Sequence, residues 1–268
     1  MPTVNKTALI TGATSGIGYE LAKLFARDGY NLVIVARKED ELRHTANTLE
    51  QAYQIRVTTI AKDLFAREAP FEVCEEVQQK GLQVDVLVND AGQGLYGEFV
   101  ETDINRELDI IQLNIGAYVV LTKYFLREMV GRNEGKILNV ASIAGKMPGP
   151  LQAVYHATKA FILSFSAAVR EEIKETNVTI TDLLPGATDT DFFHKADMED
   201  AKLVREGKLA DPADVAADGY QALMAGENKV ISGFANKLQT TMSNVLPDSA
   251  IAANMHKQMK PSSEEDEK

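Results

Sequence analysis

Three side chains that can hold or move a proton lie in the second half of the sequence. Tyr155 and Lys159 are four residues apart, so on a helix they share one face about one turn apart. A free tyrosine has a pKa near ~10, and a nearby ammonium lowers that pKa because it favours the phenolate. Ser142 lies upstream and can hydrogen-bond a substrate oxygen near the phenol. The set indicates proton transfer at a carbonyl or alcohol oxygen, although a Tyr–Lys pair alone is equally typical of a solvated helix face.

A glycine-rich turn near the start of the chain could bind a phosphate. Residues 11–18 (TGATSGIG) follow a short β-rich run and open a predicted helix. Gly12 allows the tight turn, Gly16 lets the backbone approach a pyrophosphate, and Gly18 lets the helix pack close on the sheet. The helix N-terminus adds free N–H groups and a positive dipole. The turn lacks the Gly-Lys-Ser/Thr ending of a P-loop, and a turn without a ligand is the alternative.

Apolar runs and amphipathic segments alternate along the chain and must position these residues. Strands are predicted at 7–11, 31–36, 56–61, 84–89, 136–141, 178–184 and 229–233, and helices at 16–28, 38–53, 71–80, 103–130, 153–176 and 211–225. This alternation predicts an α/β fold with a doubly wound parallel sheet, a Rossmann fold of three α/β/α layers. We expect one domain over residues 1–260 and a disordered acidic tail over 261–268.

Two further segments have a less regular pattern of apolar and polar residues. The polar stretch 186–207 is interpreted as a mobile helical flap, and the weakly amphipathic segment 234–260 is expected to pack on the domain or on a partner.

The order of these motifs resembles the short-chain dehydrogenase/reductase family, single-domain Tyr-x-x-x-Lys type, over residues 7–190. The motifs that carry the resemblance are the G-x-x-x-G-x-G turn, Asp63-Leu64, Asn89-Asp90-Ala91-Gly92, Asn114, Ser142, Tyr155 with Lys159, and Pro185-Gly186 with Thr188 and Thr190. One position departs from the pattern: Asp90 stands where the family carries a second asparagine. Aspartate keeps the shape of asparagine but loses two donors and can carry a charge, which puts the local hydrogen bonds in doubt.

The resemblance implies roles for these residues. Asn114, Ser142, Tyr155 and Lys159 would be catalytic, with Asn114 positioning a water that leads from Lys159 to solvent. The expected cofactor contacts are Gly12, Thr14, Ser15, Gly16, Ile17, Gly18, Arg37, Asp63, Leu64, Asn89, Ala91, Gly92, Tyr155, Lys159, Pro185, Gly186, Thr188 and Thr190. Alternatively, Asn114 is a helix-interior group satisfied by backbone, and the two threonines cap the flap helix.

The end of the second predicted strand favours NADP(H) over NAD(H). Rossmann proteins that prefer NAD(H) place an Asp or Glu there, about 20 residues past the glycines. Here the position falls on Ala36, and Arg37 follows. A guanidinium can bind a 2′-phosphate with two charge-assisted hydrogen bonds. Alternatively, Arg37 only starts a solvated helix. Some NADP-preferring members of the family carry a basic residue at the position of Ser15, so the expected preference for NADP(H) is modest.

The substrate pocket is expected between residues 93–96, 143–154 and the flap at 191–202, because ligands in such folds bind beyond the carboxyl ends of the strands. Met147, Leu151, Phe192 and Phe193 would form apolar walls for a moderately apolar carbonyl compound, or the two phenylalanines only anchor the flap. His156 faces about 100° away from Tyr155 and is expected to pack on a neighbour or lie at the surface.

Helices 103–130 and 153–176 carry more apolar positions than one buried face needs, which predicts a homodimer or homotetramer. The C-terminal segment could cover the same surface instead.

Composition narrows the class of protein. The 268 residues carry a formal net charge of -11, which argues against a nucleic acid or an anionic membrane as partner. No stretch approaches the ~20 apolar residues of a membrane span. Cys74 falls in a periodic pattern of apolar residues that predicts a buried helix face. No group of His, Cys, Asp and Glu residues has the spacing of metal ligands. A cytoplasmic protein is expected. The sequence thus predicts an NADP(H)-dependent oxidoreductase acting as a reductase, or alternatively an NADP(H)-binding regulatory protein without significant turnover.

Overall fold

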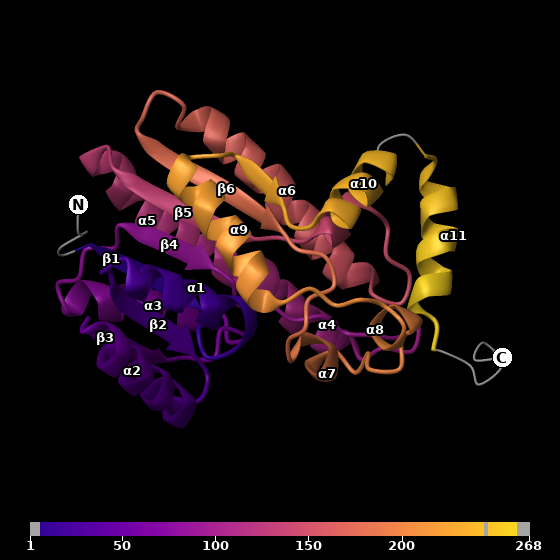
Figure 1. Cartoon of the computed structure of the whole chain (residues 1–268), viewed down its shortest axis with the longest axis horizontal. Helices are drawn as coiled ribbons and strands as arrows, with labels where there is room; N and C mark the ends of the chain where they lie inside the picture. The colour runs from indigo at the N-terminus through magenta and orange to yellow at the C-terminus, as the bar shows by residue number, and fades with distance from the viewer. Residues whose placement is uncertain (1–5, 244–245, 262–268) are drawn as a thin grey trace.

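The computed structural model describes residues 6–243 and 246–261, and within them seven parallel strands form one sheet (Figure 1). The strand order is β3-β2-β1-β4-β5-β6-β7. The strands are β1 (Thr7–Thr11), β2 (Asn31–Ala36), β3 (Val57–Ala61), β4 (Val86–Asn89), β5 (Gly135–Val140), β6 (Val178–Leu184) and β7 (Lys229–Ile231). The order reverses between β1 and β4, which is the ligand-binding position of doubly wound sheets. The predicted Rossmann fold is confirmed.

Helices cover both faces of the sheet. One face packs against α1 (Gly16–Arg27), α2 (Glu39–Tyr53) and α9 (Pro212–Ala225), and the other against α3 (Ala69–Gln79), α5 (Tyr118–Arg132) and α6 (Ala153–Glu172). Because both faces are covered, every residue of β1 is buried, and β2 is a nearly continuous apolar run.

Two predicted segments differ from the structure, and a third, the C-terminal segment, packs on the domain as expected, through Met255 and Met259. The single helix expected over 103–130 is α4 (Ile104–Ile111), a π-helical segment η1 (Gln112–Ala117) and then α5. The flap contains only two one-turn helices, α7 (Phe192–Lys195) and α8 (Lys202–Arg205). The C-terminal segment forms α10 (Phe234–Ser243) and α11 (Asp248–Met259), which lie far from the N-terminus in Figure 1. The tail expected over 261–268 lies outside the described residues from 262 onward.

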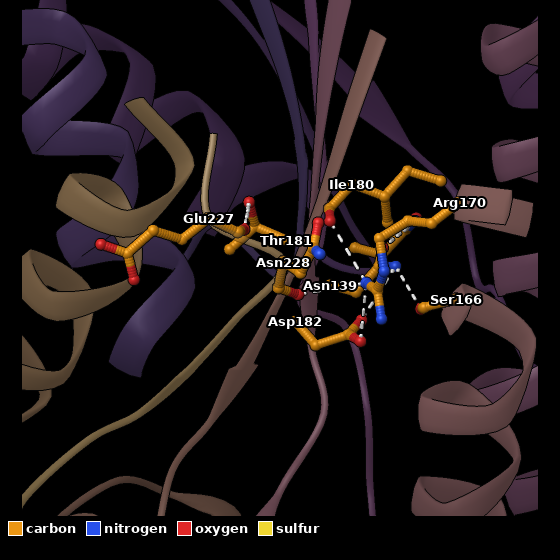
Figure 2. A network of polar contacts seen from close by, with 9 residues as sticks. Asn139, Ser166, Arg170, Ile180, Thr181, Asp182, Glu227 and Asn228 are labelled. Carbon is orange, nitrogen blue, oxygen red and sulfur yellow. Dashed lines mark hydrogen bonds and ion pairs between the residues drawn. The ribbon is translucent and has the colours of Figure 1, made fainter. Parts of the chain in front are cut away.

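A buried polar network ties together the elements that lead into the predicted site (Figure 2). Arg170 on α6 donates to the carboxylate of Asp182 on β6 at 3.0 Å and to the carbonyl of Asn228 at 3.1 Å. Asn139 on β5 donates to Ser166 on α6 at 3.0 Å. The network therefore fixes α6 against β5 and β6, whose carboxyl ends face the same edge of the sheet.

Candidate active site

The glycine turn is held tightly against the end of β4. Gly12 and Gly16 have φ values of +74° and +56°, a region that favours glycine. A Cβ on Gly18 would lie 2.5 Å from both the Gly12 carbonyl oxygen and Asp90 Oδ2, so no side chain fits there. Ser15 precedes α1 without a side-chain capping bond, so its hydroxyl does not compete with a ligand for the N–H groups of Gly16 and Ile17.

Thr11 joins this turn to β4. Its place before Gly12 was the only sequence signal for this role. Its hydroxyl accepts hydrogen bonds from the N–H groups of Asp90 and Ala91, both at 3.1 Å. Asn89 does not line the cavity, and its expected contact with a cofactor stays a prediction. The Asn89 amide instead donates to Thr122 at 3.1 Å and to Asn139.

The carboxyl of Asp90 lies beneath the glycine turn. A Cβ on Gly12 would lie 2.9 Å from its Oδ2, and the Gly18 N–H is a hydrogen-bond donor to it. Burial raises the pKa of Asp90 to about 7, while Lys159 and the Gly18 N–H act in the opposite direction. The aspartate thus accepts a hydrogen bond as an asparagine would, but it titrates near neutral pH.

Ser142, Tyr155 and Lys159 converge on one cavity beyond the carboxyl end of β5. The Lys159 ammonium lies 5.7 Å from the centroid of the Tyr155 ring and donates to the Val140 carbonyl at 2.8 Å. The Ser142 hydroxyl accepts from the Ala144 N–H at 3.1 Å and is a hydrogen-bond partner of the Tyr155 phenol. The structure therefore brings together the hydroxyl, phenol and ammonium that the sequence singled out.

The pKa values in this group differ from the sequence-based expectation. Burial raises the pKa of Tyr155 to about 12, and the hydrogen bond with Ser142 is what opposes it. The expected lowering of this pKa is not found, because the Lys159 ammonium, which donates to Val140 and lies toward the face of the ring, does not offset the effect of burial. Burial also lowers the pKa of Lys159 to about 8, with Asp90 opposing.

Asn114 lies in the π-helical segment, and its side chain holds the loop after β4. Its Oδ1 accepts from the Gln93 N–H at 3.1 Å, and its Nδ2 donates to the Gln93 carbonyl at 2.9 Å and to Thr158 at 3.0 Å. Both amide donors are therefore used, whereas Oδ1 can accept a second hydrogen bond, so the expected role in positioning a water stays a prediction. The amide fixes the loop after β4 beside α6, which fits the alternative of a satisfied interior group.

One cavity of about 950 Å³ runs from the glycine turn to the C-terminal helices. The expected contact residues that line it are Gly12, Thr14, Ser15, Gly16, Ile17, Arg37, Asp63, Leu64, Ala91, Gly92, Ser142, Tyr155, Lys159, Pro185, Gly186, Thr188 and Thr190. Gly18, Asn89 and Asn114 do not line it. Thr190 also accepts from the Phe192 N–H at 3.3 Å, so its role as a cap of α7 stands beside its place in the cavity.

Basic side chains gather at the β2 end of the cavity. Arg37 lines it and packs with its guanidinium 5.5 Å from the centroid of Phe65. Lys38 and Lys62 also line this end, and both are paired with glutamates, at 2.8 Å to Glu41 and at 2.5 Å to Glu72 respectively. No ion pair of Arg37 occurs within residues 6–243 and 246–261. Its positive charge is therefore available to an anionic group.

The other end of the cavity is apolar. Met147, Phe192 and Phe193 line it as expected, whereas Leu151 packs behind the wall. Sequence reasoning missed the contribution of the C-terminal helices, where Met255 and Met259 also line the cavity. Their spacing of four residues on one helix face was the available signal, but the surrounding segment is too weakly amphipathic to place it.

The comparisons with known proteins identify the family. The profile described as short chain dehydrogenase matches residues 6–201, and the chain belongs to this family. It is 38% identical over 176 residues to a very-long-chain 3-oxoacyl-CoA reductase of Coprinopsis cinerea, covering 65% of this chain and 52% of the relative. It is 30% identical to an NADP-dependent 3-hydroxy acid dehydrogenase of Schizosaccharomyces pombe, covering 85% of this chain and 90% of the relative.

Among solved structures, a short-chain dehydrogenase from Sphingobium yanoikuyae in complex with NADPH superimposes with a TM-score of 0.80. It is 25% identical, covering 91% of this chain and 97% of that chain. The chain spans about half the length of several of the curated relatives it matches, including the reductase of Coprinopsis cinerea. No helix within the described residues is long and apolar enough to cross a membrane.

Proposed function

We propose that this protein is an NADP(H)-dependent oxidoreductase that interconverts a carbonyl compound and an alcohol, acting as a reductase. The observation that carries the proposal is that Ser142, Tyr155 and Lys159 share one cavity with the open N-terminus of α1. The names of the relatives, an NADP-dependent dehydrogenase and 3-oxoacyl-CoA reductases, support the same class of reaction.

The residues present fit a dinucleotide. Gly16 and Ile17, at the N-terminus of α1, line the cavity, and their N–H groups suit a pyrophosphate. Arg37 at the β2 end suits a 2′-phosphate, and Ala36 in place of a carboxylate removes repulsion. Thr188 and Thr190 would hold the nicotinamide end. When bound, the cofactor would supply the hydride and, once oxidised, a positive charge near the phenol.

The chain itself supplies the proton. Ser142 donates to the substrate oxygen and orients it, while Tyr155 gives its phenolic proton to the same oxygen during reduction. Burial favours the protonated phenol that this direction requires. Lys159 is the cation beside the phenolate that then forms, and it would also bind ribose hydroxyls. Asn114 acts as a positioning residue through Gln93 and Thr158.

The test is turnover of a panel of carbonyl compounds with NADPH by the wild type and Tyr155→Phe. The phenylalanine variant should keep its NADPH affinity and lose at least about 100-fold in kcat, because general acid catalysis contributes that much. Tyr124→Phe, on α5 outside the cavity, is the matched control and should keep both. NADPH binding without reduction of any compound would contradict the proposal and favour a regulatory protein.

The assembly and the compartment are part of the proposal. Exposed apolar side chains on α4 and α6 support a homodimer or homotetramer. The acidic charge and the single, buried Cys74 thiol support the reducing cytoplasm.

A further inference from the structure

Gln152 carries a buried amide that has no hydrogen-bond partner within the described chain. The residue is 4% exposed, and its Nε2 contacts no acceptor. It lines the same cavity as Ser142 and Tyr155 and precedes the first residue of α6. Buried amides are nearly always hydrogen-bonded, so an orphan donor beside a catalytic group indicates a partner that arrives with a ligand.

The backbone holds Gln152 in place. Its N–H donates to the Gly149 carbonyl at 3.1 Å, and its carbonyl accepts from the His156 N–H at 3.0 Å. The buried His156 ring in turn contacts the Met147 carbonyl through Nδ1 at 2.9 Å, which fixes the loop before α6. His156 therefore packs on a neighbour, one of the two expected outcomes, and the Gln152 amide cannot reach another partner by moving its backbone.

An apolar cover lies over the amide. A Cβ on Gly94 would lie 2.9 Å from both the Gln152 Nε2 and the ring of Phe192, so these groups are packed closely. The Phe192 ring, from the flap, also lies 5.0 Å from the centroid of Tyr155. Phe192 thus packs against the phenol ring and close to the amide, and all three residues line the same cavity.

We propose that Gln152 donates a hydrogen bond to a second oxygen of the substrate, and so selects carbonyl compounds with an acceptor oxygen close to the reacting carbonyl. Gln152 directly precedes α6 and Tyr155 is the third residue of that helix, and both line the same cavity. A second carbonyl oxygen a few bonds from the reacting one, as in a 3-oxo acid or its ester, would supply the acceptor that the amide lacks. The inference rests on the proposed function but concerns specificity, because Gln152 takes no part in the proton transfer.

The experiment compares two ketones of equal chain length. Ethyl 3-oxobutanoate and 2-heptanone each have seven atoms in the main chain, and only the first has a second carbonyl oxygen. We expect Gln152→Leu to lower kcat/KM for the ester about tenfold relative to wild type, and to change kcat/KM for 2-heptanone less than threefold. A site that hydrogen-bonds a substrate group discriminates in this way. The variant-to-wild-type ratio removes the difference in intrinsic reactivity between the two ketones.

Two variants control for structure. Gln152→Glu keeps the shape but, when ionised, loses the donor, so it should also penalise the ester selectively. Gln51→Leu, on the exposed face of α2, should change neither substrate. An equal loss for both ketones in the Gln152 variants, or no loss for either, would overturn the inference. Wild type that binds NADPH but reduces neither ketone would overturn it as well, whereas absence of NADPH binding would overturn the proposed function itself.

Discussion

Burial moves the pKa values of Tyr155 and Lys159 in opposite directions. The pKa of the phenol rises to about 12 and the pKa of the ammonium falls to about 8, because a low-dielectric site disfavours both charged forms. The tyrosine is therefore protonated at neutral pH, as a proton donor must be. The ammonium is the group that titrates closest to the working pH, and oxygen ligands beyond Val140 would keep it charged.

The Arg37 side chain gives a prediction about cofactor preference. In Ala36→Asp/Arg37→Ala, the NADPH-to-NADH ratio of kcat/KM should fall by about 10-fold or more, since a charge-assisted hydrogen bond contributes roughly 1.5–3 kcal/mol. Lys23→Ala is the control, because Lys23 is paired with Glu20 and does not line the cavity. A wild type that prefers NADH, or a double variant with an unchanged NADPH-to-NADH ratio, would show that this end of the cavity does not bind a 2′-phosphate.

Asp90 gives a prediction about pH. Its pKa is about 7 in the folded protein and 3.8 in the reference state, so the folded form binds the extra proton between these values. Stability must then fall as pH rises from about 4 to 7. Asp90→Asn removes this loss, and its gain in unfolding free energy should be roughly 3 kcal/mol larger at pH 8 than at pH 5, because about two pH units of the loss fall between them.

Urea unfolding of both proteins at the two pH values checks this expectation. The exposed Asp214, on α9, supplies the control, because Asp214→Asn should show no such difference. An Asp90→Asn gain that is the same at pH 5 and pH 8 would contradict a titrating buried carboxyl.

At the residue scale, the sequence predicted groups that act through local spacing and missed those that act through distant contacts. Tyr155 and Lys159 needed only the period of a helix. The orientation of Asn89 depends on Thr122, and the partners of Asn114 come from Gln93 and Thr158. Such contacts between residues far apart in the chain leave no periodic signal.

At the scale of elements, α6 delivers the phenol and the ammonium, so its anchoring to the sheet governs their position. Arg170→Met should lower the free energy of unfolding by about 3 kcal/mol, because it leaves the 1% exposed Asp182 carboxylate without its cation. Burial already raises the pKa of Asp182, so the loss should be smaller at pH 5 than at pH 8.

Denaturant titrations of Arg170→Met at both pH values test this anchor. Lys174→Met, whose exposed partner is Glu171, serves as the control and should stay within about 0.5 kcal/mol of wild type. A loss of that small size in Arg170→Met would mean that the network in Figure 2 contributes little to stability.

Element boundaries were predictable where strands are buried on both faces. The apolar runs of β1, β2 and β6 gave their limits directly, since continuous burial leaves no ambiguity of period. The π-helical turn η1 could not be predicted, because one extra residue in a turn hardly changes the apolar pattern around Leu113 and Ala117. The helices α10 and α11 stayed unassigned for lack of a clear apolar face.

At the scale of the whole molecule, the cavity joins parts of the chain that differ in chemistry and in place along the sequence. The dinucleotide end is built by β1, β2 and β4 with their loops, whereas the apolar end needs the flap and α11. The first could be predicted from strand order and glycine spacing. The second depends on how Met147, Phe193 and Met255 pack together, which only the folded chain reveals.

The outer surface gives the last prediction, a homo-oligomer formed through α4 and α6. Ile104, Leu108 and Phe161 are 59%, 54% and 37% exposed, so the C-terminal helices do not cover this face. Burying a leucine contributes roughly 1.5–3 kcal/mol, and a two-fold interface counts it twice. Light scattering should find a dimer or tetramer at micromolar concentration, and Leu108→Glu should shift it to smaller species. Leu238→Glu, on the exposed face of α10, should leave the mass unchanged; a monomeric wild type, or dissociation only by Leu238→Glu, would contradict this interface.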